Sequence, residues 1–193
     1  LAGFGGLVSV GQQAFIGIGA YALVAFTNLR GLEVIPGVIL AALFTGLLAI
    51  PLSFLVFRLK GGYFAIGTWV IAEIIKLIVV QFQSLGGGAG ISVAVFADIE
   101  RESRIRFVYL AALVVAIVIL VSTFLLMRSR LGLALTAIRD DATAAGTLGV
   151  NVTAAQRAVF VLVAMGFGAA GALIALTNLR VQPDDIFSVN YSA

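Results

Sequence analysis

The sequence predicts an all-α, polytopic transmembrane bundle of about five spanning helices. Of its 193 residues, 62% are hydrophobic and only 11% are charged, and the mean hydropathy is +1.16. A soluble domain carries roughly 25% charged residues, so this chain cannot coat a water-exposed surface but suits a lipid environment. In addition, most of the charges fall between long apolar runs rather than within them.

Each predicted span is an apolar run close to the roughly 20 residues that cross a bilayer as a helix. Charged residues or a glycine-rich stretch at 86–90 close each run, and Pro51 is expected to kink the second helix. Thr153 and Gln156 fit a capping box at the start of the last helix. The predicted spans cover about 7–29, 34–57, 63–84, 107–127 and 154–179.

The composition also excludes several classes of function. The chain has no cysteine and no histidine, which removes thiol nucleophiles, imidazole chemistry and the usual zinc ligands. No phosphate-binding loop of the Walker A type is present, so the chain is not expected to hydrolyse ATP itself. Its basic residues are scattered at segment ends rather than gathered in a patch, which argues against a nucleic-acid partner. We therefore predict no catalytic residues, no metal and no cofactor.

Alternation of the spans fixes which ends share a side of the membrane. The ends at 58–60 and 128–157 lie on one side, and those at 30–33, 85–106 and 180–185 lie on the other. Lysine and arginine number six on the first side and five on the second, which favours the first as cytoplasmic. The chain also contains one internal sequence similarity, which we call the echo: 20–30 and 170–180 match at eight of eleven positions. A parallel repeat and chance similarity both explain it.

The stretch 128–153 is too polar to span the membrane and too regular to be a plain loop. Its small and apolar residues recur at spacings of three and four, which places them on one face of a short amphipathic helix. Such a helix can lie in the membrane interface as packing, or it can dock on a soluble partner. The residues of the stripe are Leu131, Leu135, Ile138, Ala142, Ala145 and Gly149.

This stretch resembles the cytoplasmic coupling segment of permeases in ABC importers, in particular the branched-chain amino acid permeases of the LivM type. The family run G-x-A-L-x-A-I-R-x-D-x-x-A-A-x-x-L-G-I-N is similar to 132–151 here, from Gly132 to Asn151. Stretches 9–21, 60–76, 85–91 and 168–192 also look like family signatures, so the resemblance covers nearly the whole chain.

The chain departs from the family pattern in three places. Trp69 follows Thr68 where the family often has leucine, and the glycine-rich loop lacks its usual polar residue. The family's terminal helices are also missing. These departures bear on the identity of the substrate more than on membership of the family.

The resemblance implies a single permease domain over 1–193, incomplete at both ends, in a bacterial-type inner membrane. Within it, 128–153 is expected to be a cytoplasmic coupling segment that contacts a separate ATPase. The other implied partners are a second permease subunit and an extracytoplasmic solute-binding protein. The residues expected to carry the coupling are Gly132, Ala137, Arg139, Asp140, Asp141, Ala145 and Gly149.

Glu73 and Lys76 are the charges inside a predicted span. They are three residues apart and therefore share one helix face. A central charge in a membrane helix costs about 2.5–3.5 kcal/mol on insertion scales, and pairing lowers that cost. The pair either lines a transport path or helix interface, or it is a structural ion pair between neighbouring helices.

Three other classes of membrane protein remain as alternatives. An ion-driven secondary transporter usually carries functional intramembrane acids. A membrane enzyme would need a cluster of catalytic side chains, and none gathers convincingly in this sequence. A non-catalytic structural membrane subunit is the third alternative.

Overall fold

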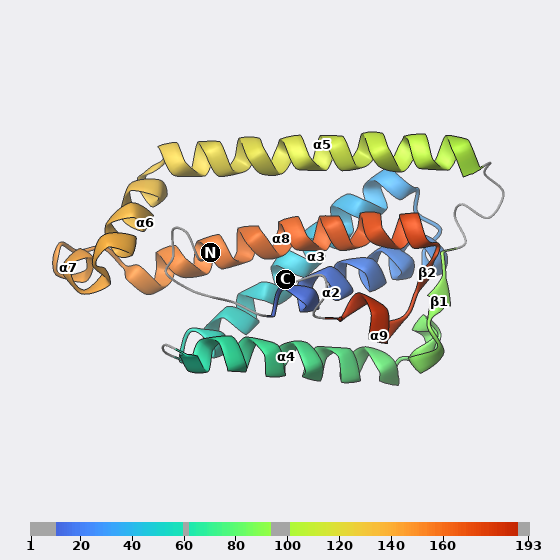
Figure 1. Cartoon of the computed structure of the whole chain (residues 1–193), viewed down its shortest axis with the longest axis horizontal. Helices are drawn as coiled ribbons and strands as arrows, with labels where there is room; N and C mark the ends of the chain where they lie inside the picture. Colours follow the sequence, from blue (N-terminus) through green and yellow to red (C-terminus); the bar gives the residue numbers. More distant parts are fainter. Residues whose placement is uncertain (1–10, 60–61, 94–100, 189–193) are drawn as a thin grey trace.

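The computed structural model describes residues 11–59, 62–93 and 101–188. Five helices form its body (Figure 1): α2 (Gln12–Val24), α3 (Val34–Val56), α4 (Gly62–Gln81), α5 (Arg101–Arg128) and α8 (Val152–Asn178). The shorter elements are α6 (Arg130–Asp140), α7 (Ala142–Thr147), α9 (Pro183–Ile186), β1 (Ile91–Ser92) and β2 (Arg180–Val181). The predicted all-α class is confirmed, because the only sheet among the described residues has two strands of two residues each.

Four of the described helices are long and apolar enough to cross a membrane, namely α3, α4 from Tyr63, α5 and α8. The other predicted span, 7–29, corresponds to α2 and the π-helical turn that continues it at Ala25–Leu29. Residues 7–10 of that span lie outside the described residues. At 1.5 Å per residue, 12–29 rises about 27 Å, close to the hydrocarbon thickness of a bilayer.

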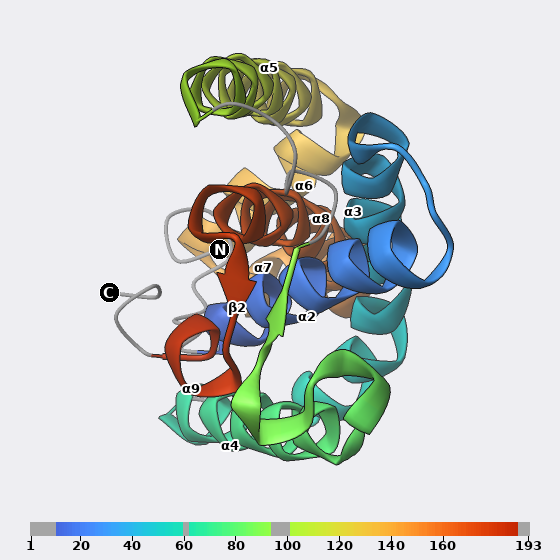
Figure 2. The ribbon, with the colours of Figure 1, turned by 90° about the vertical axis from the view of Figure 1, so that its right-hand side faces the viewer.

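Helix α2 lies at the centre of the bundle, with α8, α3 and α4 around it (Figure 2). Every residue from Gln13 to Val24 is buried, so α2 has no face for lipid. Glycines allow its close approach to α8: a Cβ on Gly19 would overlap the backbone of Gly168, and one on Gly171 would overlap the backbone of Ile16. Small residues at such crossings are the usual means of packing membrane helices.

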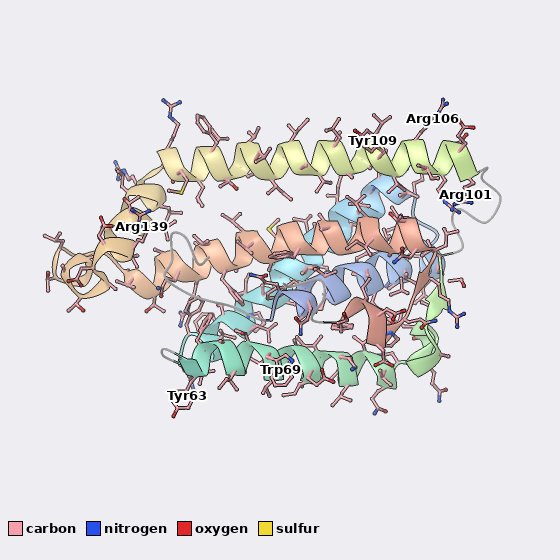
Figure 3. All side chains as sticks on the ribbon, viewed as in Figure 1. Tyr63, Trp69, Arg101, Arg106, Tyr109 and Arg139 are labelled. Carbon is pink, nitrogen blue, oxygen red and sulfur yellow. The ribbon has the colours of Figure 1, made fainter. Side chains whose placement is uncertain are left out.

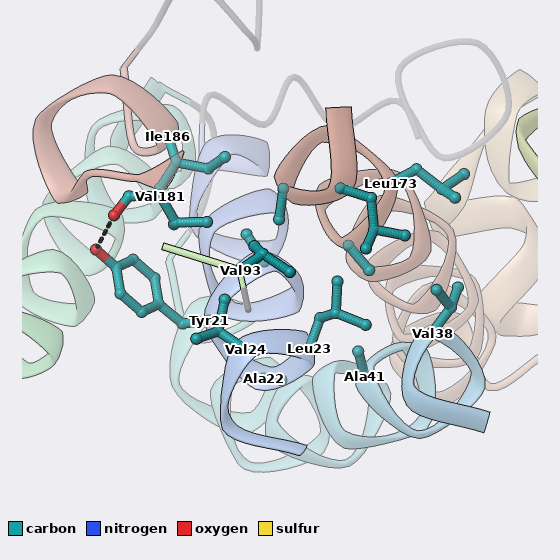
Figure 4. Packing of buried hydrophobic residues seen from close by; sticks show 14 of the residues in the cluster. Tyr21, Ala22, Leu23, Val24, Val38, Ala41, Val93, Leu173, Val181 and Ile186 are labelled. Carbon is teal, nitrogen blue, oxygen red and sulfur yellow. Dashed lines mark hydrogen bonds between the residues drawn. The ribbon is translucent and has the colours of Figure 1, made fainter. Parts of the chain in front are cut away.

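The main hydrophobic core joins this centre to the segments that follow α4 and α8 (Figure 4). Tyr21 and Leu23 of α2 share this cluster with Leu173 of α8, and it also takes in Val181 of β2 and Ile186 of α9. The Tyr21 hydroxyl donates to the carbonyl oxygen of Val181 at 3.5 Å. The C-terminal end of the described chain is therefore part of the core.

Helix α5 lies at the edge of the bundle beside α8 (Figures 1 and 2). None of its 18-residue apolar window is buried, and large hydrophobic side chains such as Leu120 are up to 69% exposed. A soluble protein does not tolerate an apolar surface of this extent, whereas lipid covers it at no cost. The exposure of α5 thus agrees with a membrane environment.

The end of the bundle that holds the turn at 30–33 is closed by short segments. Two 3₁₀ turns after α4 lead into β1, which pairs antiparallel with β2 directly after α8. The Asn28 side-chain amide donates to the carbonyl oxygen of Ser92 at 2.8 Å, and the Arg180 guanidinium donates to that of Ala89 at 3.0 Å. These bonds join the ends of α2, α4 and α8 in one cap.

The opposite end of the bundle holds α6 and α7 (Figure 1). The C-terminal end of α3, the N-terminal end of α4 and the stretch 128–152 therefore lie at this same end, as alternation of the spans predicts. An exposed tyrosine lies near each end of the bundle (Figure 3). Tyr63 at this end is 76% exposed, and Tyr109 near the other end is 69% exposed. Tyrosine is enriched where a helix leaves the hydrocarbon layer.

The echoing segments 20–30 and 170–180 run in the same direction on the adjacent helices α2 and α8. Thr27 and Thr177 hold equivalent positions in the echo, and each hydroxyl donates to the carbonyl four residues earlier. The helix ends then differ, because α2 continues into a π turn whereas α8 stops at Leu179, whose φ is +58°.

Candidate functional site

The stretch 128–153 forms two helices, and the prediction of one continuous helix is wrong. Asp141 separates α6 from α7 and adopts an extended backbone, with φ −157° and ψ 109°. Its carboxylate accepts hydrogen bonds from the backbone N–H groups of Thr143 at 2.7 Å and Ala144 at 3.0 Å. This local bonding competes with helix continuation and caps α7 instead.

The predicted apolar stripe is buried only in its middle part. Leu135, Ile138 and Ala145 are at most 5% exposed and pack with Ala155 of α8 in a separate small core. Leu131, Ala142 and Gly149 are exposed, so the stripe does not form one continuous buried face. The buried part fixes α6 and α7 against the bundle.

The other face of α6 and α7 is open. Arg139 and Asp140 are exposed, with 53% and 75% of their side chains accessible and 3.6 Å between Arg139 Nε and Asp140 Oδ1. Two leucines of the same segment are also exposed: Leu133 of α6 at 71% and Leu148, directly after α7, at 82%. The predicted residue Ala137 is half-buried between these faces. We call Leu133, Arg139, Asp140 and Leu148 the outer face of α6–α7.

Two glycines of the predicted site shape the backbone. A Cβ on Gly132 would overlap the backbone of Met127, so this glycine permits the sharp turn from α5 into α6. Gly149 has φ +87° and ends α7, where its N–H bonds to Gly146 and the N–H of Val150 bonds to Ala145. This is a Schellman motif, in which glycine is favoured because L side chains are strained at positive φ.

The local hydrogen bonds also perturb the acidity of Asp141. The N–H groups of Ala144 and Thr143 favour the charged carboxylate and hold the pKa of Asp141 below its ordinary value. Asp141 therefore remains ionised at every pH near neutrality, and α7 keeps its cap. Asp141 is a structural residue of the segment, although the sequence also fits a contact residue.

The next helix also begins differently from the prediction. Asn151, rather than Thr153, is the N-cap of α8, and its side-chain oxygen accepts from the N–H of Ala154 at 3.0 Å. Asparagine caps helices at least as well as threonine, and α8 therefore begins two residues earlier than predicted.

The charged pair inside α4 forms a larger cluster than the sequence indicates. Lys76 Nζ lies 3.0 Å from Glu73 Oε1 and 3.1 Å from Asp184 Oδ1 of α9. The Lys76 side chain is 22% exposed, whereas that of Asp184 is 84% exposed. The cluster ties α9 to α4, so it bridges helices near the end of the bundle that carries the short sheet.

The sequence pattern missed Leu133, Leu148 and Asp184. Leu133 and Leu148 fall outside the apolar stripe. A leucine outside the stripe, on an otherwise polar face, was the signal that could have marked each of them as an exposed contact residue. Asp184 lies 108 positions after Lys76, and no local spacing reveals that approach. Among the described residues, no group of three or more acidic, histidine or cysteine side chains could hold a metal ion.

Comparison with known proteins assigns the family. The family model described as "Branched-chain amino acid transport system / permease component" matches residues 1–193. The chain belongs to this family. The resemblance seen in the motif at 132–151 is thereby confirmed.

Two curated members of the branched-chain permease family are similar to the chain. The high-affinity branched-chain amino acid transport system permease protein LivM of Salmonella typhimurium (strain LT2) is 30% identical over 208 aligned positions. The protein of the same name from Escherichia coli (strain K12) is 29% identical. Each alignment covers 94% of the chain, and the chain spans about half the length of these relatives, at 49%. No solved structure matches the chain significantly.

Proposed function

We propose that the chain forms the transmembrane permease part of an ATP-driven importer for branched-chain or related hydrophobic amino acids. The family model over residues 1–193 carries this proposal. The two similar permeases are named for branched-chain amino acid transport, which supports the substrate class. An ion-driven transporter or a purely structural subunit is not favoured by either comparison.

The outer face of α6–α7 is proposed as the contact with a cytoplasmic ATPase subunit. Two exposed leucines and an exposed arginine and aspartate on the same segment combine apolar anchors with charges, which suits a protein groove. The buried residues Leu135, Ile138 and Ala145 would pass force from that contact to α8. Among the predicted coupling residues, Arg139 and Asp140 would make contacts, whereas Gly132, Asp141, Ala145 and Gly149 would hold the geometry.

Alternating access would follow from this arrangement. Moving a two-state equilibrium from 1:99 to 99:1 needs about 5.5 kcal/mol of differential binding. ATP binding and hydrolysis on the partner would supply that energy through α6–α7. The assembly would include a second permease subunit and an external solute-binding protein, in a bacterial-type inner membrane. Glu73 and Lys76 would bridge helices on the external side rather than contact substrate.

Co-expression with a candidate ATPase tests the proposal. Leu133→Glu and Asp140→Lys are expected to abolish co-purification, because each alters the outer face without touching the cap at Asp141. Asp185→Lys, in α9 at the opposite end, is the matched control and is expected to leave the complex intact. Uptake of radiolabelled leucine should then stop when ATP is depleted. Persistence of the complex in both α6–α7 variants, with uptake insensitive to ATP, would overturn the proposal.

A further inference from the structure

Arg157 lies in an unusual position at the end of the bundle that carries α6 and α7. It projects from the second turn of α8 toward the last turn of α3, and its Cζ atom is 4.0 Å from the ring centroid of Phe54. Phe54 is 52% exposed on the outer surface of α3. A guanidinium thus rests on an aromatic ring that faces lipid, at the boundary between two spanning helices.

This guanidinium is incompletely satisfied. Its Nε atom is buried and has no hydrogen-bond acceptor within reach among the described residues. The side chain as a whole is half-buried, so part of it stays at the surface. The aromatic face offsets some of the charge, since cation–π contacts contribute about 0.5–2 kcal/mol. An anion at the exposed edge, bound by the terminal N–H groups, would pair the positive charge, which no carboxylate of the described residues does.

A second arginine follows Phe54 closely in the sequence, at the same end of α3. Arg58 follows Phe54 by four residues and is exposed in the turn after α3, where its backbone N–H bonds to the Leu55 carbonyl. Neither Arg58 nor Arg157 forms an ion pair with a carboxylate in the described part of the chain. The two described carboxylates at this end, Asp140 and Asp141, are on α6–α7, one beside Arg139 and the other capping α7.

The same combination recurs on α5. Arg128 lies over the ring of Phe124, 5.2 Å from its centroid, and Phe124 is 58% exposed. Both arginine–phenylalanine pairs therefore lie at one end of the bundle with the ring on the lipid-facing surface. This places each guanidinium at the depth of the lipid headgroups and each ring at the start of the acyl chains.

We propose that Arg157, which lies over Phe54, forms a binding site for the phosphate of an anionic phospholipid at the α3–α8 boundary, together with Arg58 in the turn after α3. The planar guanidinium of Arg157 suits a phosphate because it offers parallel N–H donors. The Phe54 ring packs against the glycerol and upper acyl chain. Basic pockets between membrane helices recognise anionic headgroups in this way. The site does not depend on transport, so it stands or falls separately from the proposed function.

Native mass spectrometry of the protein, purified with phosphatidylglycerol and phosphatidylcholine, tests the site. Wild type is expected to retain phosphatidylglycerol in preference to phosphatidylcholine. Arg157→Gln and Arg58→Gln should each weaken that retention by about fivefold. Arg130→Gln removes the same charge at the same end but away from the α3–α8 boundary, and it should retain the lipid as wild type does. Excess inorganic phosphate should not displace the lipid, since it lacks acyl chains.

Four outcomes would overturn the site. These are equal retention of the two lipids, unchanged retention in both glutamine variants, an equal loss in Arg130→Gln, and displacement of the lipid by inorganic phosphate. Arg58→Gln changes an exposed turn and is expected to fold. If Arg157→Gln is unstable, unchanged retention in Arg58→Gln alone would overturn the site. Arg157→Lys separates loss of charge from loss of the planar group.

Discussion

Gly171 illustrates how single residues set the distance between helices in this bundle. A Cβ at this position would overlap the backbone of Ile16 in α2, which cannot rotate away as a side chain can. Gly171→Ala is therefore expected to lower the stability of the bundle by about 1–3 kcal/mol, the usual range for overpacking. A fall in the thermal midpoint in detergent measures this effect.

Gly146→Ala is the matched control for that substitution. Gly146 lies in α7 with open space where a Cβ would be added, and its φ is not positive. Alanine should be neutral there or stabilise α7 by about 0.5–1 kcal/mol. If both variants melt alike, close backbone packing is not what Gly171 provides.

Asp141 gives the segment a dependence on pH. Its folded-state pKa lies below that of the unfolded chain because two backbone N–H groups bond to the carboxylate. The cap therefore stabilises α7 fully above the unfolded pKa of about 3.9, and the stabilisation is lost as the pH falls through the lower, folded pKa. Hydrogen exchange of the Thr143 and Ala144 amides, corrected for intrinsic rates, should show protection falling in that acidic range.

Asp141→Asn provides the comparison, because asparagine keeps an oxygen acceptor but does not titrate. The variant should retain protection of α7 with little dependence on pH. Identical acid-induced loss in the variant and in wild type would exclude the carboxylate as the titrating group.

Residue-level inference from the sequence succeeded where the cause is local. The pairing of Glu73 with Lys76 follows from their spacing, and the structure confirms the contact. The role of Asp141 as a cap was missed. Its position between residues of a regular apolar stripe is equally consistent with an exposed residue within one helix. Asp184 was missed because its approach to Lys76 depends on the path of α9, which only the assembled bundle determines.

At the scale of elements, the ion pair between Lys76 and Asp184 anchors α9 to α4. Asp184→Asn is expected to leave the melting temperature nearly unchanged, since an exposed ion pair contributes about 0–1 kcal/mol. It should instead raise hydrogen exchange across 183–188, because α9 is short and loses its link to α4. Asp185→Asn, at the neighbouring position, should have little effect on that exchange. Equal exchange in the two variants would show that the pair does not hold α9.

The helices themselves were predictable because long uncharged runs leave few alternatives in lipid. The predicted bounds of 34–57 and 154–179 fall within two residues of those of α3 and α8, whereas α5 begins at Arg101, six residues before the predicted 107. Which helices pack against one another was not predictable. Hydropathy does not distinguish the enclosed helix α2 from the lipid-facing helix α5, since both are apolar all round and only packing decides which one is buried.

For the whole molecule, the central claim is a multi-pass permease with α6–α7 at one membrane surface and the cap of β1, β2 and α9 at the other. The two ends differ in what they expose. One presents the outer face of α6–α7 beside the arginines of the proposed lipid site. The other presents the sheet with Glu73, Lys76 and Asp184 close below it. An importer that couples to an ATPase on one side of the membrane and receives solute on the other would require two different ends of this kind.

Cysteine labelling in oriented membranes tests this claim most directly. The chain has no cysteine, so a single one introduced at Thr147 in α7 or at Ser84 after α4 reports alone. With an impermeant maleimide, the cysteine at 147 should react only in inside-out vesicles, and the cysteine at 84 only in right-side-out cells. Reaction of both from the same side would contradict the arrangement of spans on which the account rests.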